Sequence, residues 1–536
     1  MDDPRQNIAR MVEAPANLDE MQGERAGESR EFSPIDEDGT DVPEPSKKSP
    51  KARSRKAKPD DEAREARALG YDIEAMNDEF ALVMMGSKAV VFVDQPAAPI
   101  EDAKRIWALE AFHSYFSNKF TEILADDGKI KRVTWSKAWQ TSKFRRSYRG
   151  VEFFPDPKNI TNTKDYLNLW TGFTVEPKPW AGTAEYGPGK CPYAIFRDHL
   201  FSNVCGGKKD LFRWVFGFFA HMMQRPRERI GVALVMRGIM GSGKSKVGEA
   251  MGKLIAGHYF MVDDPRYVTG QFNAHMATCL LLQADEAVWA GDKAAEGRLK
   301  GLITSPIQQI EAKGVDPIRL KNYVRLIMTS NEDWVVPAGK DERRFCVLDI
   351  DPRCAQNHDY FREMDEELEN GGYEALLGDL LAFDLESVPL RKIPMTEALL
   401  EQKLRSLNHV ESWWYGLLMA GSTKRNACDW QRMVASVTLF EDYLTVSDKI
   451  GVKRKSEETV FGTAMKKLVS YTRAQRTVEV FDAKGTARLQ KTWVWLLPNL
   501  NEAREQFDKL MHQPTEWPVI EVNDAGETGL EGYSDF

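Results

Sequence analysis

Residues 230–245 read IGVALVMRGIMGSGKS, an apolar run followed by a glycine-rich loop that ends in Lys244 and Ser245. Residues 230–236 contain no charged side chain, which is typical of a strand buried on both faces of a parallel sheet. Residues 247–255 have helical composition, so a strand, a loop and a helix follow in the order that a phosphate-binding loop needs. The stretch therefore predicts an α/β core built around a P-loop.

The residue types of this loop indicate how it would hold a nucleotide. Glycines let backbone N–H groups converge on phosphate oxygens, and the start of the following helix favours an anion. Lys244 is expected to reach the β- and γ-phosphates of ATP, and the Ser245 hydroxyl to ligate Mg²⁺. ATP and Mg²⁺ are thus the predicted cofactors, and the predicted binding residues are Gly238, Gly241, Ser242, Gly243, Lys244 and Ser245.

Polar residues follow two further apolar runs. Residues 278–284 (TCLLLQA) are followed by Asp285 and Glu286. Asp285 is expected to hold Mg²⁺ and Glu286 to polarise the attacking water, an arrangement that suits hydrolysis better than transfer to a second substrate. Another run, residues 323–328, leads to Asn331, which would orient the same water. An asparagine after a strand is otherwise a turn residue.

Two arginines, Arg343 and Arg344, precede a further predicted strand at residues 346–350. One of them is expected to reach the γ-phosphate held by a neighbouring subunit and to stabilise the charge of the transition state. The alternative is a basic surface cluster paired with Asp341 and Glu342. The sequence leaves open which of the two arginines would act.

The order of these motifs resembles that of the superfamily-3 helicase core. More closely, it resembles the helicase portion of phage and poxvirus-type primase-helicases and of phage primase-polymerases. The resemblance covers roughly residues 75–500. Its motifs are GIMGSGKS (238–245), FNAHM (272–276), LLLQADE (280–286), TSN (329–331) and DERRF (341–345).

The resemblance implies an AAA+ ATPase that assembles as a ring, usually a hexamer, around single-stranded DNA. ATP would bind between subunits, and its hydrolysis would drive translocation and unwinding. Such helicases carry a Phe-Asn element before the acidic strand, here Phe272 and Asn273. They also place a lysine that tracks the DNA backbone on a hairpin, here residues 310–317. Lys313 is the first candidate for this phosphate contact and Lys321 the second; a solvated lysine beside a turn is the alternative.

The region before the core divides into a charged tail and an ordered part. Residues 1–66 are poor in aromatic residues, which predicts a disordered tail, and their basic run is either solvated or a phosphate contact. Residues 70–200 are expected to form an α+β collar region. Residues 80–93 predict a β-hairpin and residues 106–120 a helix.

Basic and aromatic residues are interleaved at residues 143–149, KFRRSYR. Such a pattern suits stacking on single strands, and it equally suits arginine stems that lie on a packed core. No pair of metal-binding carboxylates is apparent before the ATPase core. We therefore expect a stand-alone helicase whose priming is supplied by a separate primase or polymerase.

The ATPase core is assigned to residues 201–385, and the segment after it predicts further domains. In residues 395–500, helices are followed by two strands with a basic hairpin, which predicts a winged-helix-like DNA-binding domain. An interaction module with ordinary surface charge is the alternative. Residues 512–536 are expected to form an acidic, disordered tail.

Composition limits the remaining classes. The net charge of −8 does not indicate nucleic acid by itself, and the six cysteines form no CxxC pair. No apolar stretch is long enough to span a bilayer, so we expect no membrane partner and a cytoplasmic protein of a bacterial host, encoded by a phage or prophage. The predicted function is an ATP-dependent replicative DNA helicase of a phage or mobile element. The alternative is an AAA+ DNA-binding initiator or regulator with little unwinding activity.

Overall fold

The structure is a computed structural model that describes most of the chain after residue 69. The described residues are 70–95, 104–124, 129–158, 163–178, 191–270, 273–286, 293–311, 317–423, 430–481 and 487–520. Across them, no helix combines the length and the apolar character that crossing a membrane would require. The predicted tail at residues 1–66 lies outside the described part, and so do residues 521–536 of the predicted acidic tail.

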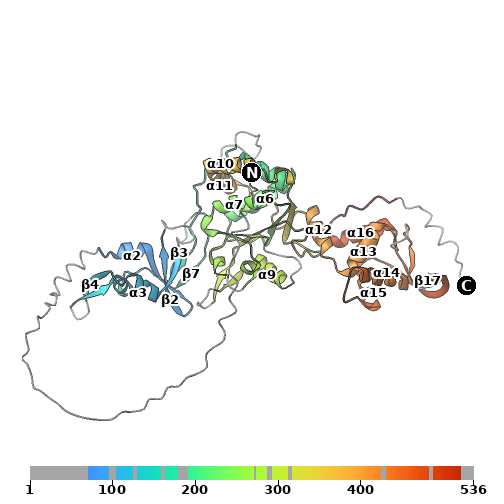
Figure 1. The fold of residues 1–536 in the computed structure, drawn as a ribbon, viewed down its shortest axis with the longest axis horizontal. Helices are drawn as coiled ribbons and strands as arrows, with labels where there is room; N and C mark the ends of the chain where they lie inside the picture. Colours follow the sequence, from blue (N-terminus) through green and yellow to red (C-terminus); the bar gives the residue numbers. More distant parts are fainter. Residues whose placement is uncertain are drawn as a thin grey trace, which may run out of the picture. The chain divides into compact units, whose positions relative to one another are not determined.

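A five-stranded parallel sheet forms the core that positions the site (Figure 1). Its order is β10 (Tyr259–Val262), β11 (Leu281–Asp285), β14 (Arg325–Ser330), β9 (Ala233–Arg237) and β15 (Phe345–Asp349). Every residue of β9 and β14 is buried, as the apolar runs predicted for a sheet covered on both faces. The carboxyl ends of β11, β14, β9 and β15 lie at one edge of the sheet. The cross-strand pairs there are Asp285–Thr329, Ser330–Arg237 and Arg237–Asp349.

Helices cover this sheet. In the view of Figure 1, α6, α7, α10 and α11 lie above the sheet and α9 below it. The helices of the core are α5 (Ala194–Asp198), the π-helix η2 (His199–Val204), α6 (Lys209–Gln224), α7 (Lys244–Lys253), α8 (Pro265–Thr269), α9 (Lys293–Thr304), α10 (His358–Glu367) and α11 (Tyr373–Ala382). The predicted α/β class is confirmed at this coarse level.

The part before the core is α+β, as expected, but one of its elements was wrongly predicted. The hairpin of β1 (Phe80–Met85) and β2 (Lys88–Asp94) is present and lies in a sheet of order β3-β2-β1-β6. Residues 106–120 are not one helix: β3 (Lys104–Ala108) precedes a short α3 (Leu109–Tyr115). Ile106 and Trp107 pair with residues of β2, and this pairing overrides the helical spacing of the aromatic positions.

The other elements of this part are short. They are α2 (Ile73–Glu79), α4 (Trp135–Thr141), the antiparallel pair β4 (Phe120–Leu124) and β5 (Ile130–Thr134), β6 (Ser147–Tyr148), and the parallel pair β7 (Gly150–Glu152) and β8 (Tyr166–Asn168).

The segment after the core has its own apolar cluster, which includes Trp413 and Trp414. Its helices are α12 (Glu397–Arg405), α13 (His409–Ala420), α14 (Ser436–Lys449), α15 (Glu458–Leu468) and α16 (Leu500–Met511). Its sheet has the order β16 (Met433–Ala435), β18 (Ala487–Leu496), β17 (Thr472–Phe481). Helices followed by a two-stranded hairpin agree with the predicted pattern. Helix α16 was not predicted, and it buries Phe507 and Met511 in the same cluster.

Candidate active site

The glycine-rich loop joins the carboxyl end of β9 to the first residue of α7. Gly241 has φ +76° and Gly243 has φ +86°, backbone conformations that side chains with a Cβ rarely adopt. A Cβ on Gly243 would lie 2.6 Å from Cε1 of His199 and 2.7 Å from Cε1 of Phe361. Glycine is therefore required here for both conformation and space.

Lys244 is buried at the start of α7 and turns back over the loop. Its Nζ donates to the carbonyl oxygens of Gly238 at 2.8 Å and Ile239 at 2.9 Å. It also donates to Oδ1 of Asn331 at 2.6 Å. Burial lowers the pKa of Lys244, and the carboxylates of Glu286 and Asp285 oppose that shift. The predicted lysine and the predicted water-orienting asparagine are thus in direct contact.

Ser245 and Asp285, the predicted metal ligands, are also in contact. Oγ of Ser245 donates to Oδ2 of Asp285 at 3.0 Å. The Thr329 hydroxyl donates to the other carboxylate oxygen, Oδ1. Thr329 was not singled out from the sequence, and it is the β11–β14 register that places it opposite Asp285. The two hydroxyls fix both oxygens of the carboxylate.

Glu286 has an unusual backbone conformation for a residue that carries a side chain. Its φ is +55°, in the left-handed region that costs a non-glycine residue about 1 kcal/mol or more. Its N–H donates to the Thr329 carbonyl at 2.9 Å, and its Oε1 accepts from the backbone N–H of Asn331 at 3.1 Å. This bend holds the Glu286 carboxylate next to the end of β14.

Arg343 and Arg344 lie elsewhere in the same chain. Phe345 pairs with Ala233, so both arginines are at the amino end of β15, whereas the loop follows the carboxyl end of β9. A strand rises about 3.3 Å per residue, which separates them from the loop by at least roughly 13 Å. Buried Glu342 accepts from the N–H of Arg343 at 2.9 Å and of Arg344 at 2.7 Å. Within the described part of the chain, the exposed Arg343 guanidinium has no hydrogen-bond or ion-pair partner.

The hairpin predicted to follow DNA is present as β12 (Ile307–Ile310) and β13 (Ile318–Lys321). Lys321 is exposed at the end of β13, whereas Lys313 and Phe272 lie outside the described residues. Asn273 contacts the end of β12 that leads to the turn: its Nδ2 donates to the Gln309 carbonyl at 2.9 Å, and its Oδ1 accepts from Glu311 N at 2.8 Å. Asn273 and the hairpin are therefore joined by hydrogen bonds.

His199 contacts the loop at Gly243, a supporting role that was not predicted from the sequence. It is fully buried in η2, with Nδ1 3.0 Å from Nδ2 of Asn203 and Nε2 3.3 Å from the Gly243 carbonyl. The amide nitrogen of Asn203 can only donate, so Nδ1 of His199 accepts this hydrogen bond. Nε2 therefore carries the ring proton and donates to the Gly243 carbonyl. Burial lowers the pKa of His199, which favours the neutral ring. A histidine within an apolar helical run gives no sequence signal for this role.

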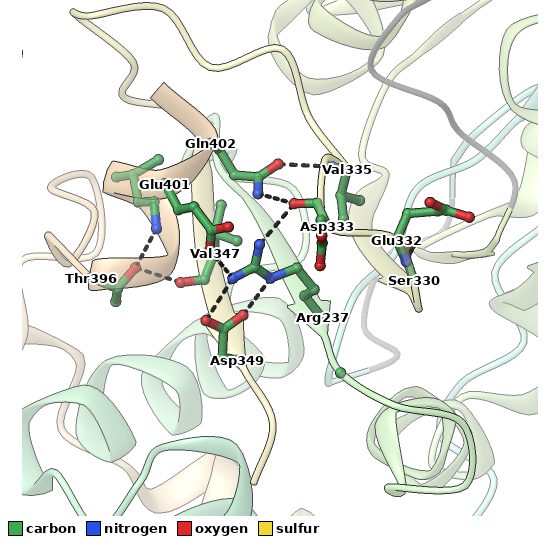
Figure 2. A network of polar contacts seen from close by, with 12 residues as sticks. Arg237, Ser330, Glu332, Asp333, Val335, Val347, Asp349, Thr396, Glu401 and Gln402 are labelled. Carbon is green, nitrogen blue, oxygen red and sulfur yellow. Dashed lines mark hydrogen bonds and ion pairs between the residues drawn. The ribbon is translucent and has the colours of Figure 1, made fainter. Parts of the chain in front are cut away.

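Arg237, the last residue of β9, was also missed, and Figure 2 shows the network around it. Its Nε and Nη2 donate to the two oxygens of Asp349 at 2.6 and 2.8 Å, and Nη1 donates to the Asp333 carbonyl at 2.7 Å. It also pairs with Glu401 of α12. Gln402 donates to the same Asp333 carbonyl at 2.7 Å. The bonds to Asp349 and then Glu401 raise the pKa of Arg237. The bond to Asp333 joins the start of the loop to the segment after Asn331.

We expect Arg237→Ala to lower the free energy of unfolding by about 2 kcal/mol. The substitution removes both donors of the Asp349 carboxylate. It removes one donor each from the Glu401 carboxylate and the Asp333 carbonyl, which keep their bonds to Arg405 and Gln402, and the half-exposed carboxylates moderate the loss. Urea unfolding would measure the change. Arg353→Ala, which removes an exposed ion pair with Asp351, is the control and should cost less than about 1 kcal/mol. Equal losses of unfolding free energy in the two variants would show that the Arg237 network contributes no more to stability than an exposed ion pair.

Gly243→Ala is expected to abolish saturable nucleotide binding. The new Cβ would clash with His199 and would be held at a positive φ, so the loop must move. Equilibrium titration with ATP would measure the loss. Gly297→Ala is the matched control, because Gly297 lies in α9 with no atom within 4 Å of the added Cβ. Normal binding by Gly243→Ala would mean that the loop geometry is unimportant.

Together, fold and site define a mixed α/β protein whose glycine-rich loop meets an acidic strand end at the carboxyl edge of a parallel sheet. A family of unknown function (DUF5906) matches residues 236–344, which include the loop, Asp285 and Arg344. The chain is 22% identical over 229 residues to the DNA primase-polymerase of Nitratiruptor phage NrS-1. That match covers 40% of this chain and 32% of the phage protein, so the chain matches about a third of its relative's length.

Solved structures of the C-terminal region of NrS-1 are similar in fold. The apo structure of that region (305–718) has a TM-score of 0.54 and 16% identity, and the match covers 80% of this chain and 99% of the other. An A form apo structure of the region has a TM-score of 0.53 and 15% identity, with 79% and 98% covered. The predicted resemblance to phage primase-polymerases is thus confirmed at the level of overall similarity.

Proposed function

We propose that this chain is a P-loop ATPase of the AAA+ superfamily-3 type that moves along single-stranded DNA as a replicative helicase of a phage or mobile element. One observation carries the proposal. Five polar residues from three parts of the sequence meet at one edge of the sheet, joined by hydrogen bonds of 2.6 to 3.1 Å. They are Lys244, Ser245, Asp285, Glu286 and Asn331. In open parallel sheets, ligands bind beyond the carboxyl ends of the strands.

The donor set suits a magnesium–nucleotide complex. Ser245 and Asp285 offer hard oxygen ligands on one side of the loop, and Mg²⁺ prefers a few such ligands together with phosphate oxygens and water. Mg²⁺ would neutralise negative charge between the phosphates. Lys244, already buried beside the loop, would exchange its carbonyl partners for phosphate oxygens.

The residues next to this complex are arranged for hydrolysis. Glu286 would accept a proton from water while the neighbouring Asn331 amide orients that water toward the γ-phosphate. The positive φ of Glu286 directs its carboxylate toward Asn331. Strained backbone conformations of this kind are common at active sites.

Arg343 or Arg344 would complete the site from a neighbouring subunit. Within one chain both lie at the opposite edge of the sheet, and the Arg343 side chain is exposed. An arginine there is suited to act on another copy, as in a ring of subunits. Its charge would stabilise the transition state, in which negative charge is spread over the γ-phosphoryl group. We propose a homo-hexamer, with separate primase or polymerase partners in a bacterial cytoplasm.

The DNA substrate is proposed from the relative and from the hairpin. The phage protein to which the chain is similar is a DNA primase-polymerase, so replication is the context we propose here as well. Lys313 and Lys321 of the hairpin would contact DNA phosphates, with Lys321 exposed for that purpose. The winged-helix-like segment would add a further DNA contact.

Strand displacement tests this function directly. The purified full chain, with ATP and Mg²⁺, should separate a duplex that carries a single-stranded tail, and should fail to do so with a non-hydrolysable ATP analogue. ATP hydrolysis stimulated by DNA without strand separation would instead support the initiator or regulator. Neither hydrolysis nor separation would reject both functions.

A further inference from the structure

The described stretch 129–151 concentrates positive charge in a protein of net charge −8. It contains no aspartate or glutamate, and its basic residues are Lys129, Lys131, Arg132, Lys137, Lys143, Arg145, Arg146 and Arg149. A local excess of this kind attracts polyanions whatever the overall charge. The proposed ATPase mechanism uses none of these residues.

The structure divides the basic residues of 143–149 into two groups. Arg145 and Arg146 turn inward: Arg145 bonds to the Gln140 carbonyl, and Nη1 of Arg146 donates to the Asn77 carbonyl at 3.1 Å. Lys143 and Arg149 are exposed, and in the described part of the chain neither side chain has a carboxylate partner. Lys137 on α4 is exposed in the same way. The two interpretations of this segment therefore apply to different residues. Arg145 and Arg146 pack within the protein, whereas Lys137, Lys143 and Arg149 are free to bind a ligand.

Phe144 is a large apolar side chain that this segment leaves in solvent, with 68% of its surface exposed. The ammonium group of Lys143 lies 4.9 Å from the centre of its ring. An exposed aromatic ring beside an unpaired cation is the combination that stacks on a base and contacts the adjoining phosphate.

The backbone that carries Phe144 is held firmly by Asn77 of α2. Asn77 Nδ2 donates to the Phe144 carbonyl at 2.9 Å, and its Oδ1 accepts from Arg146 N at 2.8 Å and from Nε1 of Trp139 at 2.9 Å. Trp139 is fully buried. The exposed ring is therefore presented by a fixed turn, which reduces the entropy lost when a ligand binds.

We propose that residues 137–149 form a second binding surface for single-stranded DNA, in which Phe144 stacks on a base and Lys137, Lys143 and Arg149 contact phosphates. This inference relies on the proposed function only for the identity of the ligand. The surface lies in the region before the ATPase core and needs no nucleotide to bind. It would hold the strand independently of the hairpin that carries Lys321.

Fluorescence anisotropy of labelled oligothymidylate, titrated with the full chain without nucleotide, tests the proposal. Phe144→Ala should weaken binding roughly tenfold, because stacking of a base on an aromatic ring contributes about 1–3 kcal/mol. Phe144→Trp, which keeps an aromatic ring at this position, should bind the oligothymidylate as the wild-type chain does. Tyr115→Ala, which removes another exposed ring from the same region, should leave binding unchanged. Unchanged binding by Phe144→Ala, or a failure of Phe144→Trp to restore it, would overturn the stacking role.

Salt dependence tests the phosphate contacts separately. Lys143→Ala and Arg149→Ala should each reduce the slope of log K against log salt by about 0.7, and Lys209→Ala should not. Equal effects in all three would overturn the assigned contacts. Binding of a peptide of residues 516–536 at this surface in preference to oligothymidylate would identify an acidic protein segment as the ligand and would also overturn the proposal. Because no ATP is present, these outcomes are independent of hydrolysis.

Discussion

Lys244→Ala should reduce ATP hydrolysis by at least about a hundredfold and remove detectable ATP binding. Lys244 is the buried cation of the loop, and its Nζ already contacts two loop carbonyls and Asn331. Loss of one preorganised donor at developing negative charge costs about 10²–10³ in rate. Phosphate release and equilibrium ATP titration would measure the two effects.

The control for this variant is Lys253→Ala, at the exposed end of the same helix. It removes the same charge from α7 without touching the loop, so hydrolysis should be unchanged. Thermal unfolding would check that both variants are folded. Hydrolysis by Lys244→Ala at the wild-type rate would mean that the loop at residues 238–245 is not the nucleotide site.

Glu286→Gln should separate binding from hydrolysis. We expect ATP affinity to stay near its wild-type value, because the amide keeps an oxygen that accepts from Asn331 N. The rate of hydrolysis should fall about 10²–10⁴-fold, since glutamine cannot take a proton from water. Single-turnover phosphate release, with ATP affinity measured in parallel, would show the split.

Glu332→Gln is the matched control for that variant. Glu332 is an exposed acid just after Asn331, and its change is chemically the same. It should have little effect on either quantity. If both variants lost hydrolysis equally, the loss would come from reduced negative charge near the site, and Glu286 would have no specific part.

The sequence predicted the elements of the site well because its signals there are local. A glycine-rich loop between an apolar strand and a helix has few alternative structures, and the carboxyl ends of parallel strands share one edge. Lys244, Ser245, Asp285, Glu286 and Asn331 consequently meet as expected. Their roles with ATP remain predictions, as do those of Arg343, Arg344 and Lys313.

The supporting contacts could not be predicted because they join distant positions. Arg237 pairs with Glu401, 164 positions away, and His199 reaches the loop through a π-helix that has no sequence signature. Helix α16 was missed although Asn499 and Glu502 form a capping box at its start. At residues 104–108, pairing with β2 overrode a helical pattern.

The rate of phosphate release by the wild-type chain, with and without single-stranded DNA, tests the central claim most directly. In the proposed mechanism, Ser245 and Asp285, which are in contact, would hold Mg²⁺, and Glu286 and Asn331, which are also in contact, would activate water. We expect release that requires Mg²⁺ and accelerates when single-stranded DNA is added. No release above background in the presence of ATP, Mg²⁺ and DNA would contradict the proposed ATPase.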